Sequence, residues 1–202
     1  MDFDFLIFPR VEELDIIGPY EIFGKVNDVS DLRCGLHILA SSEITFCNHG
    51  LPLYRTRSLE QGQLGDVLVV PGGKGVRESS RERTAVIDHI RRTHDSYELI
   101  LTVCTGTFLL EEAGALKDKT CTTHSRYQDL LREKGYAVVP HRIVHHGTLI
   151  TSTGVTSGID ASLYAVTVLF GKSLAQDIIE RIEYLFSIDD IMKMAYIIQA
   201  DR

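Results

Sequence analysis

Leu101–Leu110 reads LTVCTGTFLL, and it joins an apolar, β-branched run to a segment with apolar residues at helical spacing. The first part predicts a buried strand and the second a helix, so Cys104 falls at the turn between them. A free cysteine is most often a small buried hydrophobe. Alternatively, the turn projects the side chain into a crevice, where the N–H groups that begin the helix favour a thiolate. The local pattern leaves both interpretations open.

The turn has the pattern T-x-C-x-G, which is similar to the G-x-S-x-G nucleophile elbow. Cys104 takes the place of the serine, and Thr102 takes the place of the first glycine. Backbone N–H groups at the start of the following helix, Thr105's among them, are candidates to stabilise an anion that develops on a substrate.

The same alternation of strand and helix patterns extends over the chain in both directions. A further helix is expected to begin near Gly18-Pro19, because proline is poorly tolerated inside a helix. Continuous apolar strands between helices indicate an α/β fold, with a mostly parallel sheet and helices on both faces. We expect one domain over 1–187 and a helical tail over 188–202. Strands are predicted at 3–9, 32–40, 66–73 and 97–103, hairpins at 43–56 and 142–152, and helices at 82–95, 105–116, 125–135, 157–171 and 173–186.

Composition narrows the class of protein. The 202 residues are 44% hydrophobic and carry a net charge of −7, which argues against a nucleic-acid surface. No apolar stretch reaches the roughly 18 residues that a membrane span requires, and the amino terminus lacks the basic leader of a secretory signal. The spacing of the four cysteines fits neither a zinc site nor a disulfide framework. We therefore expect reduced thiols in a cytoplasmic protein, without a metal.

In a parallel sheet, ligands bind outside the carboxyl ends of the strands. This rule predicts that Cys104 meets Gly72 and Gly73, which follow the strand at 66–73. The two glycines are either a tight turn or a place where the backbone approaches a ligand and donates N–H groups. In the second case, they form an oxyanion-type pocket together with the Thr105 N–H.

A cysteine nucleophile also needs a group that moves protons. Asp15 lies between apolar residues, so it either caps the helix or points into an apolar crevice with a raised pKa, where it acts as acid and then base. His124, just before the helix at 125–135, is a second candidate, although a surface or capping role is the more common one for such a histidine. Glu12, Glu13 and Glu21 are the other acidic candidates of this segment.

Four segments together resemble the ThiJ/PfpI superfamily (class I glutamine amidotransferase-like): 14–23, 66–75, 103–124 and 154–163. Thr105 follows Cys104 where PfpI-type proteases and glyoxalase-like members often carry histidine. The combination of Asp15 with Cys104 and Thr105 is similar to the isonitrile hydratase family. Ser125 departs from the tryptophan that relatives often have, which puts the substrate in question.

The resemblance implies a flavodoxin-like three-layer sandwich, a homodimer, and no metal or organic cofactor. It also implies that the Cys104 thiolate attacks an isonitrile carbon while Asp15 supplies the proton, which gives a thioimidate. Water activated by Asp15 then releases an N-substituted formamide, and Thr105 helps to hold the Asp15 carboxyl and the substrate.

Two other functions use the same residues. AraC-type regulators carry a similar domain as a ligand sensor and follow it with a helix-turn-helix region. Only a short segment follows Ser187 here, which argues against a self-contained DNA-binding regulator. Redox sensing or protection against reactive carbonyls would instead rely on oxidation or alkylation of Cys104. The presence of Asp15 together with Cys104 favours catalysis, because a pure sensor needs no proton donor opposite a thiol.

Overall fold

A central sheet of eight strands organises the protein, in the order β12-β10-β11-β7-β6-β1-β2-β5. The structure is a computed structural model that describes residues 1–198. Neighbouring strands are parallel except for the antiparallel pair β10 and β11. The strands of this sheet are β1 (Asp2–Leu6), β2 (Gly35–Ala40), β5 (Arg57–Ser58), β6 (Val67–Val70), β7 (Leu99–Thr102), β10 (Ile143–His146), β11 (Leu149–Ser152) and β12 (Ala195–Ile198).

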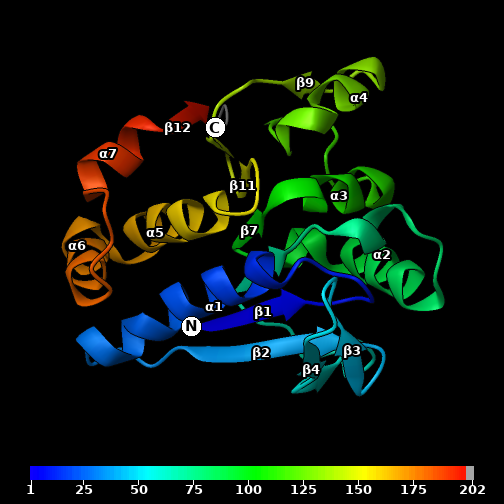
Figure 1. The fold of residues 1–202 in the computed structure, drawn as a ribbon, viewed down its shortest axis with the longest axis horizontal. Coiled ribbons are helices and arrows are strands. Elements are labelled where there is room, and N and C mark those ends of the chain that lie inside the picture. The colour runs from blue at the N-terminus through cyan, green and yellow to red at the C-terminus, as the bar shows by residue number, and fades with distance from the viewer. Residues whose placement is uncertain (199–202) are drawn as a thin grey trace.

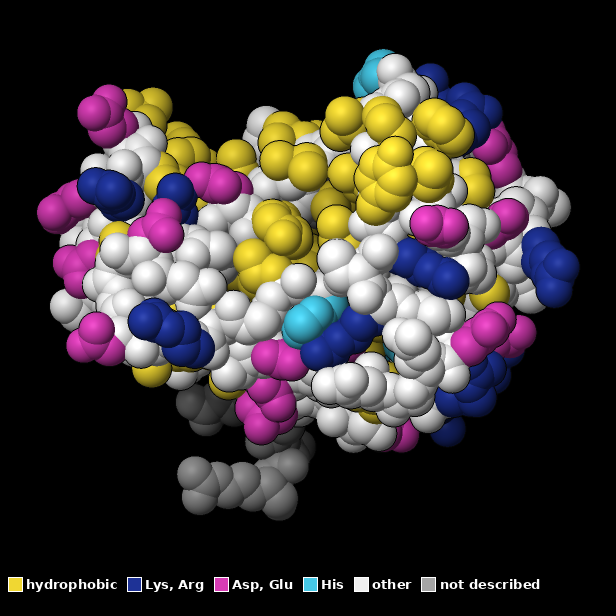
Figure 2. All heavy atoms as spheres, turned by 90° about the horizontal axis from the view of Figure 1, so that it is seen from below, with side chains coloured by type: hydrophobic (Ala, Val, Ile, Leu, Met, Phe, Trp, Pro, Cys, Tyr) yellow, Lys and Arg dark blue, Asp and Glu magenta, His cyan; other side chains and the backbone are white. Residues whose placement is uncertain are grey.

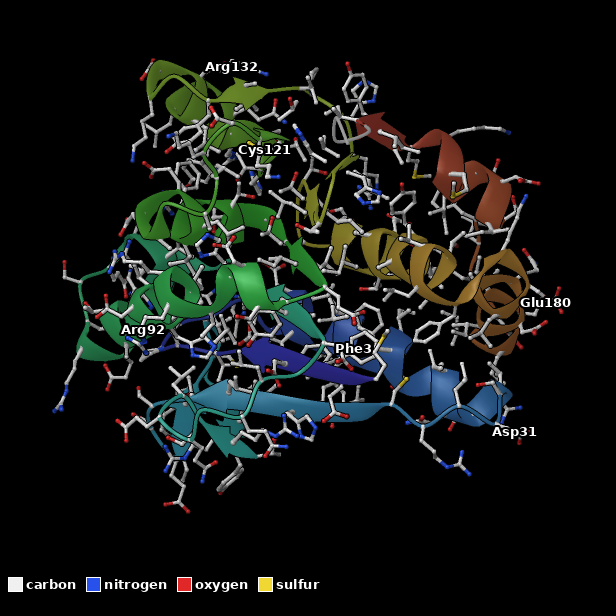
Figure 3. All side chains as sticks on the ribbon, turned by 180° about the vertical axis from the view of Figure 1, so that it is seen from behind. Phe3, Asp31, Arg92, Cys121, Arg132 and Glu180 are labelled. Atoms are coloured by element: carbon white, nitrogen blue, oxygen red, sulfur yellow. The ribbon has the colours of Figure 1, made fainter. Side chains whose placement is uncertain are left out.

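Helices cover both faces of the sheet, as the sequence predicts (Figure 1). Side chains of a strand alternate between faces, and β6 shows the result. Val67 and Val69 pack in the layer with α1, α5 and α6, whereas Leu68 and Val70 pack in the layer with α2 and α3. The helices are α1 (Glu13–Val29), α2 (Arg81–Thr93), α3 (Thr107–Ala113), α4 (Gln128–Glu133), α5 (Ser157–Phe170), α6 (Lys172–Arg181) and α7 (Ile188–Lys193). Figure 3 shows side chains filling both layers, with Phe3 between the sheet and the helices of the first layer.

Short elements complete the fold. The predicted hairpins are confirmed: β3 (Ile44–Phe46) pairs with β4 (Pro52–Tyr54), and β10 pairs with β11. A small parallel pair joins β8 (Thr120–Cys121) to β9 (Ala137–Val138). Four 3-10 turns lie between the larger elements: η1 (Lys74–Arg77), η2 (His94–Ser96), η3 (Cys104–Gly106) and η4 (Ser125–Tyr127).

The predicted start of the first helix is wrong. Helix α1 begins at Glu13, and Pro19 lies inside it. A proline there removes one helical hydrogen bond, which typically costs about 3 kcal/mol. Helix α1 packs closely on α5 around this proline. A Cβ added to Gly18 would lie 3.1 Å from Ile159 Cγ1, and a Cβ added to Gly158 would lie 3.5 Å from Pro19 Cδ, so glycines allow the two helices to approach. Tertiary contact thus overrides the local preference, and the longer helix brings Asp15 into its first turn.

The expected helical tail is only partly helical. Helix α7 is followed by β12, which pairs with β10 in parallel and forms one edge of the sheet. The tail is therefore part of the central sheet, because its apolar residues 195–198 complete the strand pairing of β10. The last part of the predicted tail, 199–202, lies outside the described residues. Within 1–198, no helix combines the length and apolar character that a membrane crossing requires.

Candidate active site

Strands β1, β6 and β7 are neighbours, so the segments that follow their carboxyl ends meet at one edge of the sheet. Cys104 follows β7 directly and has a φ of 57°, a left-handed conformation that non-glycine residues rarely adopt. The turn needs a glycine at Gly106, because a Cβ there would lie 2.3 Å from the Val70 carbonyl oxygen. The structure thus confirms the abrupt strand-to-helix turn, which holds the Cys104 side chain at the junction with only 6% of its surface exposed.

Buried threonines brace this turn through hydrogen bonds that the sequence analysis did not predict. Thr123 Oγ1 donates a hydrogen bond to the Cys104 carbonyl oxygen at 2.8 Å. Thr107 Oγ1 donates to the Thr122 carbonyl at 2.9 Å and lies 2.9 Å from Thr102 Oγ1. All four threonines are buried. These bonds satisfy the backbone around the strained residue and fix its position, as a reactive side chain requires.

Asp15 is fully buried beside Cys104 in the first turn of α1. Its Oδ2 accepts a hydrogen bond from the Gly72 N–H at 2.9 Å, whereas its Oδ1 has no partner among residues 1–198. The residue that precedes the helix is Glu12, so the alternative of a capping aspartate is wrong. A buried carboxylate oxygen without a partner costs free energy, and such groups are typical of catalytic sites.

The glycines after β6 position the site. The Gly73 N–H donates to Thr105 Oγ1 at 3.1 Å, and the Gly72 N–H is taken by Asp15. A Cβ on Gly72 would lie 2.6 Å from Thr105 N and 3.0 Å from Asp15 Oδ2, so only glycine allows this approach. Neither N–H is therefore free for a substrate anion in this arrangement. The third N–H of the expected pocket, that of Thr105, faces the Cys104 sulfur.

Burial, rather than the start of the helix, has the largest effect on the pKa of the Cys104 thiol. Burial, together with the charge of the nearby Asp15, raises the pKa of Cys104 to about 12, although the N–H and hydroxyl of Thr105 act in the opposite direction. Burial likewise raises the pKa of Asp15 to about 7, against the lowering effect of the Gly72 hydrogen bond. Burial therefore opposes the thiolate that the start of the helix favours. Near neutral pH the pair consists of a Cys104 thiol and a carboxyl group that is close to half ionised.

His124 lies beside the turn, but its side chain caps a turn of its own. Its backbone N–H donates to the Cys104 carbonyl at 3.4 Å, while Nδ1 accepts a hydrogen bond from Arg126 N at 3.2 Å. The ring lies against Tyr127, with 5.7 Å between ring centroids. No hydrogen bond joins this side chain to Cys104 within the described residues, so the arrangement agrees with the capping alternative.

The other cysteines contribute nothing to this pair, whereas the charge of the neighbouring Glu12 helps to raise the pKa of both Asp15 and Cys104. All four cysteines are free and buried, and Figure 3 shows Cys121 among packed side chains. Glu12, Glu13 and His49 have ligand atoms within 4.8 Å of one another, but Glu13 already pairs with His49 at 2.9 Å. These three side chains are the group among residues 1–198 that could hold a metal ion. The thiol and the carboxyl alone can move a proton and form a bond to an electrophilic carbon.

Known proteins resemble this chain over most of its length. The chain is 35% identical over 181 residues to "Isonitrile hydratase" from Pseudomonas putida, which covers 89% of this chain and 77% of that protein. It is 26% identical to "Protein DJ-1alpha" from Drosophila melanogaster, over 86% and 79% of the two chains. Among solved structures, a ThiJ/PfpI family protein from Pseudomonas syringae superposes with a TM-score of 0.79 at 25% identity, covering 92% of this chain and 76% of that one.

These similarities confirm the predicted superfamily and the flavodoxin-like sandwich. The model of the DJ-1/PfpI family matches residues 4–167, a span that includes β1, the Asp15 helix, the glycine turn and the Cys104 elbow. The chain belongs to the DJ-1/PfpI family.

Proposed function

We propose that this protein is a cysteine-dependent hydratase that adds water to an isonitrile and releases an N-substituted formamide. In this proposal Cys104 is the nucleophile, Asp15 carries the proton, and Thr105 orients both. One observation carries the proposal: Asp15 Oδ1 is buried beside Cys104 and has no hydrogen-bond partner among the described residues. An oxygen held in this way is available to take a proton from the thiol. The 35% identity to an isonitrile hydratase supports the substrate class.

The first step is addition of the thiol to the terminal carbon of the isonitrile. The Asp15 carboxylate takes the Cys104 proton as the sulfur–carbon bond forms, and the protonated carboxyl then delivers that proton to the same carbon. The product is a thioimidate with a C=N double bond. A carboxyl pKa of about 7 suits both transfers, because general acid–base groups work best near the operating pH.

The second step is hydrolysis of the thioimidate. Asp15, ionised again, takes a proton from water as the water oxygen adds to the carbon, and it passes that proton to the nitrogen. Cleavage of the carbon–sulfur bond then transfers the remaining proton of the added hydroxyl, through Asp15, to the Cys104 sulfur and releases the formamide. One water molecule is consumed, and no electron is gained or lost. The Thr105 N–H stabilises charge near the sulfur, in keeping with its lowering effect on the thiol pKa.

The redox alternative is less well supported by the same geometry. Oxidation of a cysteine proceeds through the thiolate and needs solvent access. Burial raises the Cys104 pKa to about 12, and only 6% of the residue surface is exposed. A thiol that ionises only when a neighbouring base takes its proton suits a bound electrophile better than a dissolved oxidant.

Turnover of an alkyl isonitrile tests the proposal. We expect formamide formation by the wild-type protein, incorporation of ¹⁸O from labelled water, and loss of activity in Cys104→Ala and Asp15→Asn. Intact-protein mass spectrometry after an acid quench should detect a Cys104 adduct whose added mass equals that of the isonitrile. The matched control is Cys34→Ala, since Cys34 is another buried free cysteine and lies at the amino end of β2.

The contrary result is equally clear. If several isonitriles remain unchanged while a dicarbonyl is consumed, the hydratase proposal fails and the reactive-carbonyl function replaces it. If neither an isonitrile nor a dicarbonyl is consumed or forms an adduct with Cys104, both cysteine-based functions fail.

We also propose a cytoplasmic homodimer that needs no nucleic acid and no membrane. Exposed apolar side chains on α1 and the β3–β4 hairpin support a second copy as the partner. Figure 2 shows hydrophobic side chains gathered on the face that carries the hairpin. Light scattering of the wild type and of Phe46→Lys should distinguish dimer from monomer. The exposed residues are Leu14, Ile17, Ile44, Phe46, Leu51 and Tyr54.

A further inference from the structure

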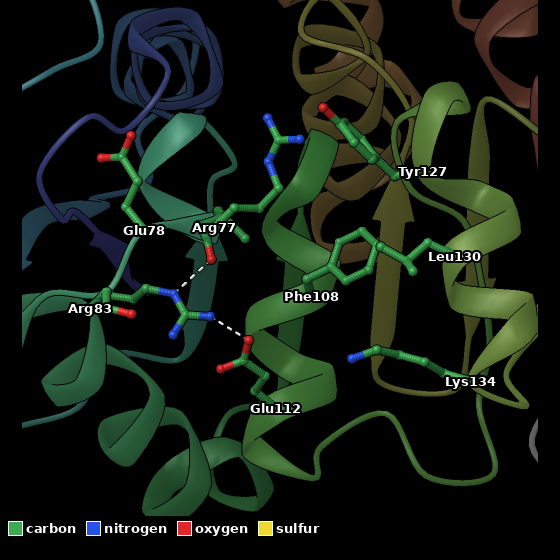
Figure 4. Close-up of a pocket in the computed structure, with 10 residues that line it drawn as sticks. Arg77, Glu78, Arg83, Phe108, Glu112, Tyr127, Leu130 and Lys134 are labelled. Atoms are coloured by element: carbon green, nitrogen blue, oxygen red, sulfur yellow. Dashed lines mark hydrogen bonds and ion pairs between the residues drawn. The ribbon is translucent and has the colours of Figure 1, made fainter.

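A cavity of about 340 Å³ lies between η1, α3 and α4, outside the Cys104 pair. Figure 4 shows its lining, with Phe108 and Leu130 facing one another and Lys134 extending below them toward α3. Phe108 is one helical turn beyond Cys104, and neither Cys104 nor Asp15 contributes to the lining. The volume is at the lower end of the roughly 300–1,000 Å³ that small-molecule sites occupy, which suits a compact ligand.

The walls of this cavity are aromatic and aliphatic. Phe108 and Tyr127 meet edge to face, with 6.4 Å between ring centroids. Leu130 completes this side with 44% of its surface exposed. Apolar groups that converge on a concave space favour a ligand with an apolar body, of which one aromatic ring is the simplest example.

The charges at the rim favour an anion. The two carboxylates of the lining already have cationic partners: Glu112 pairs with Arg83, and Glu78 pairs with Arg10. Lys134 pairs with Glu111 at 2.6 Å. The charges of these three pairs cancel, so they leave the cavity without a net negative charge.

Arg77 differs from these cations. Its guanidinium carbon lies 4.5 Å from the centroid of the Tyr127 ring, at the mouth of the cavity. Within residues 1–198 it has neither an ion pair nor a side-chain hydrogen bond, so its donors are uncommitted. An aromatic face attracts a cation but does not neutralise it. The guanidinium fork matches the two oxygens of a carboxylate.

We propose that this cavity is a binding site for a small monocarboxylate with a one-ring apolar body, separate from the Cys104 site. The carboxylate would pair with Arg77, and the ring would lie between Phe108 and Leu130. A single anionic group is favoured, because Arg77 is the one cation of the lining whose charge no carboxylate of the described residues balances. The site does not depend on which reaction Cys104 performs.

Fluorine NMR of 3-(4-fluorophenyl)propanoate provides the test, with its uncharged amide as the matched probe. We expect the acid to bind the wild-type protein and the amide to bind at least about tenfold more weakly, since the hydrogen bond to a charged group is lost. Arg77→Gln should weaken binding of the acid to the same extent, and Arg77→Lys should restore part of it. Leu130→Glu should also weaken it, because it adds a carboxylate to the apolar wall.

Two further variants separate this site from the rest of the molecule. Arg92 is an exposed arginine of α2 that lies outside the cavity (Figure 3). Its removal in Arg92→Gln should leave binding unchanged. Cys104→Ala should also leave it unchanged. Equal affinity for acid and amide, full binding by Arg77→Gln, or loss of binding in Cys104→Ala would each overturn the proposal. So would the absence of any binding of the acid at millimolar concentration.

Discussion

Asp4, in the middle of β1, and Asp15, in the first turn of α1, are both fully buried, yet only Asp4 has hydrogen-bond or ion-pair partners for both of its carboxylate oxygens. Asp4 accepts hydrogen bonds from Gly65 N at 2.6 Å and Tyr97 Oη at 3.0 Å, and it pairs with Arg57 at 3.4 Å. Asp15 has one backbone donor, no cationic partner among residues 1–198, and a free oxygen.

The difference separates a structural carboxylate from a reactive one. A buried charge that only supports the fold is surrounded by donors and a cation, because leaving it unpaired costs several kcal/mol. Asp160 follows this pattern too, since Tyr184 Oη donates to it at 2.7 Å and Arg142 pairs with it. Asp15 is the exception among these three, and in the proposed function its free oxygen takes the proton of Cys104. The predictions below test this contrast.

The largest expected effect is on activity. Asp15→Asn should lower kcat for isonitrile hydration by about 10²–10⁴-fold, because the amide cannot carry the proton. Its oxygen can still accept from Gly72 N, so the free energy of unfolding should not fall. Asp4→Asn is the matched variant and should keep kcat. Equal loss of activity in the two variants would remove the distinction between the two aspartates.

For the free energy of unfolding, the large effect is expected at Asp4 rather than at Asp15. Asp4→Ala should lower the free energy of unfolding by about 3–5 kcal/mol, because Arg57, Tyr97 and Gly65 lose their common partner. Urea unfolding followed by circular dichroism measures this. The activity of the folded fraction should match wild type. A change below about 1 kcal/mol would contradict the structural role of Asp4.

The pH dependence of stability gives an independent measure of Asp15. Its folded pKa is raised from 3.8 to about 7, so the folded protein binds the proton more tightly than the unfolded chain. This contribution is fully present below about pH 4 and is lost as pH rises through about 7, at a cost on the order of 4 kcal/mol. The difference in unfolding free energy between wild type and Asp15→Asn should therefore fall over that range. A difference that stays constant with pH would place the Asp15 pKa near its ordinary value.

The smallest expected effect concerns the hydrogen bond from Tyr97 to Asp4. Tyr97→Phe removes one of the donors to Asp4 and should lower the free energy of unfolding by about 1 kcal/mol without changing kcat. A thermal melt of the two proteins at the same pH measures the shift. A destabilisation as large as that of Asp4→Ala would mean that Tyr97, rather than Arg57, provides most of the compensation for the buried charge.

Much of the fold is predictable from the sequence, because local patterns determine it. Apolar runs such as 67–70 and 99–102 are too short and too apolar for surface helices, and their alternation with amphipathic segments implies a parallel sheet. The Cys104 elbow is also local, since it needs only a strand, a turn with Gly106 and a helix. The β12 edge strand escaped prediction because a four-residue apolar run forms a strand only where a neighbour offers free pairing groups.

The sequence by itself determined the order of strands and helices, the position of Cys104 at a strand-to-helix turn, and Asp15 as a candidate partner. Only the tertiary structure decided which groups contact Asp15, Gly72 and Gly73 and how deeply Cys104 is buried. Gly72, which donates to Asp15, is 57 positions away from it in the sequence, and Thr105, which accepts from Gly73, is 32 positions away. Burial, which depends on the whole fold, sets both pKa values, so no local pattern could reveal a resting thiol beside a carboxyl that titrates near neutral pH.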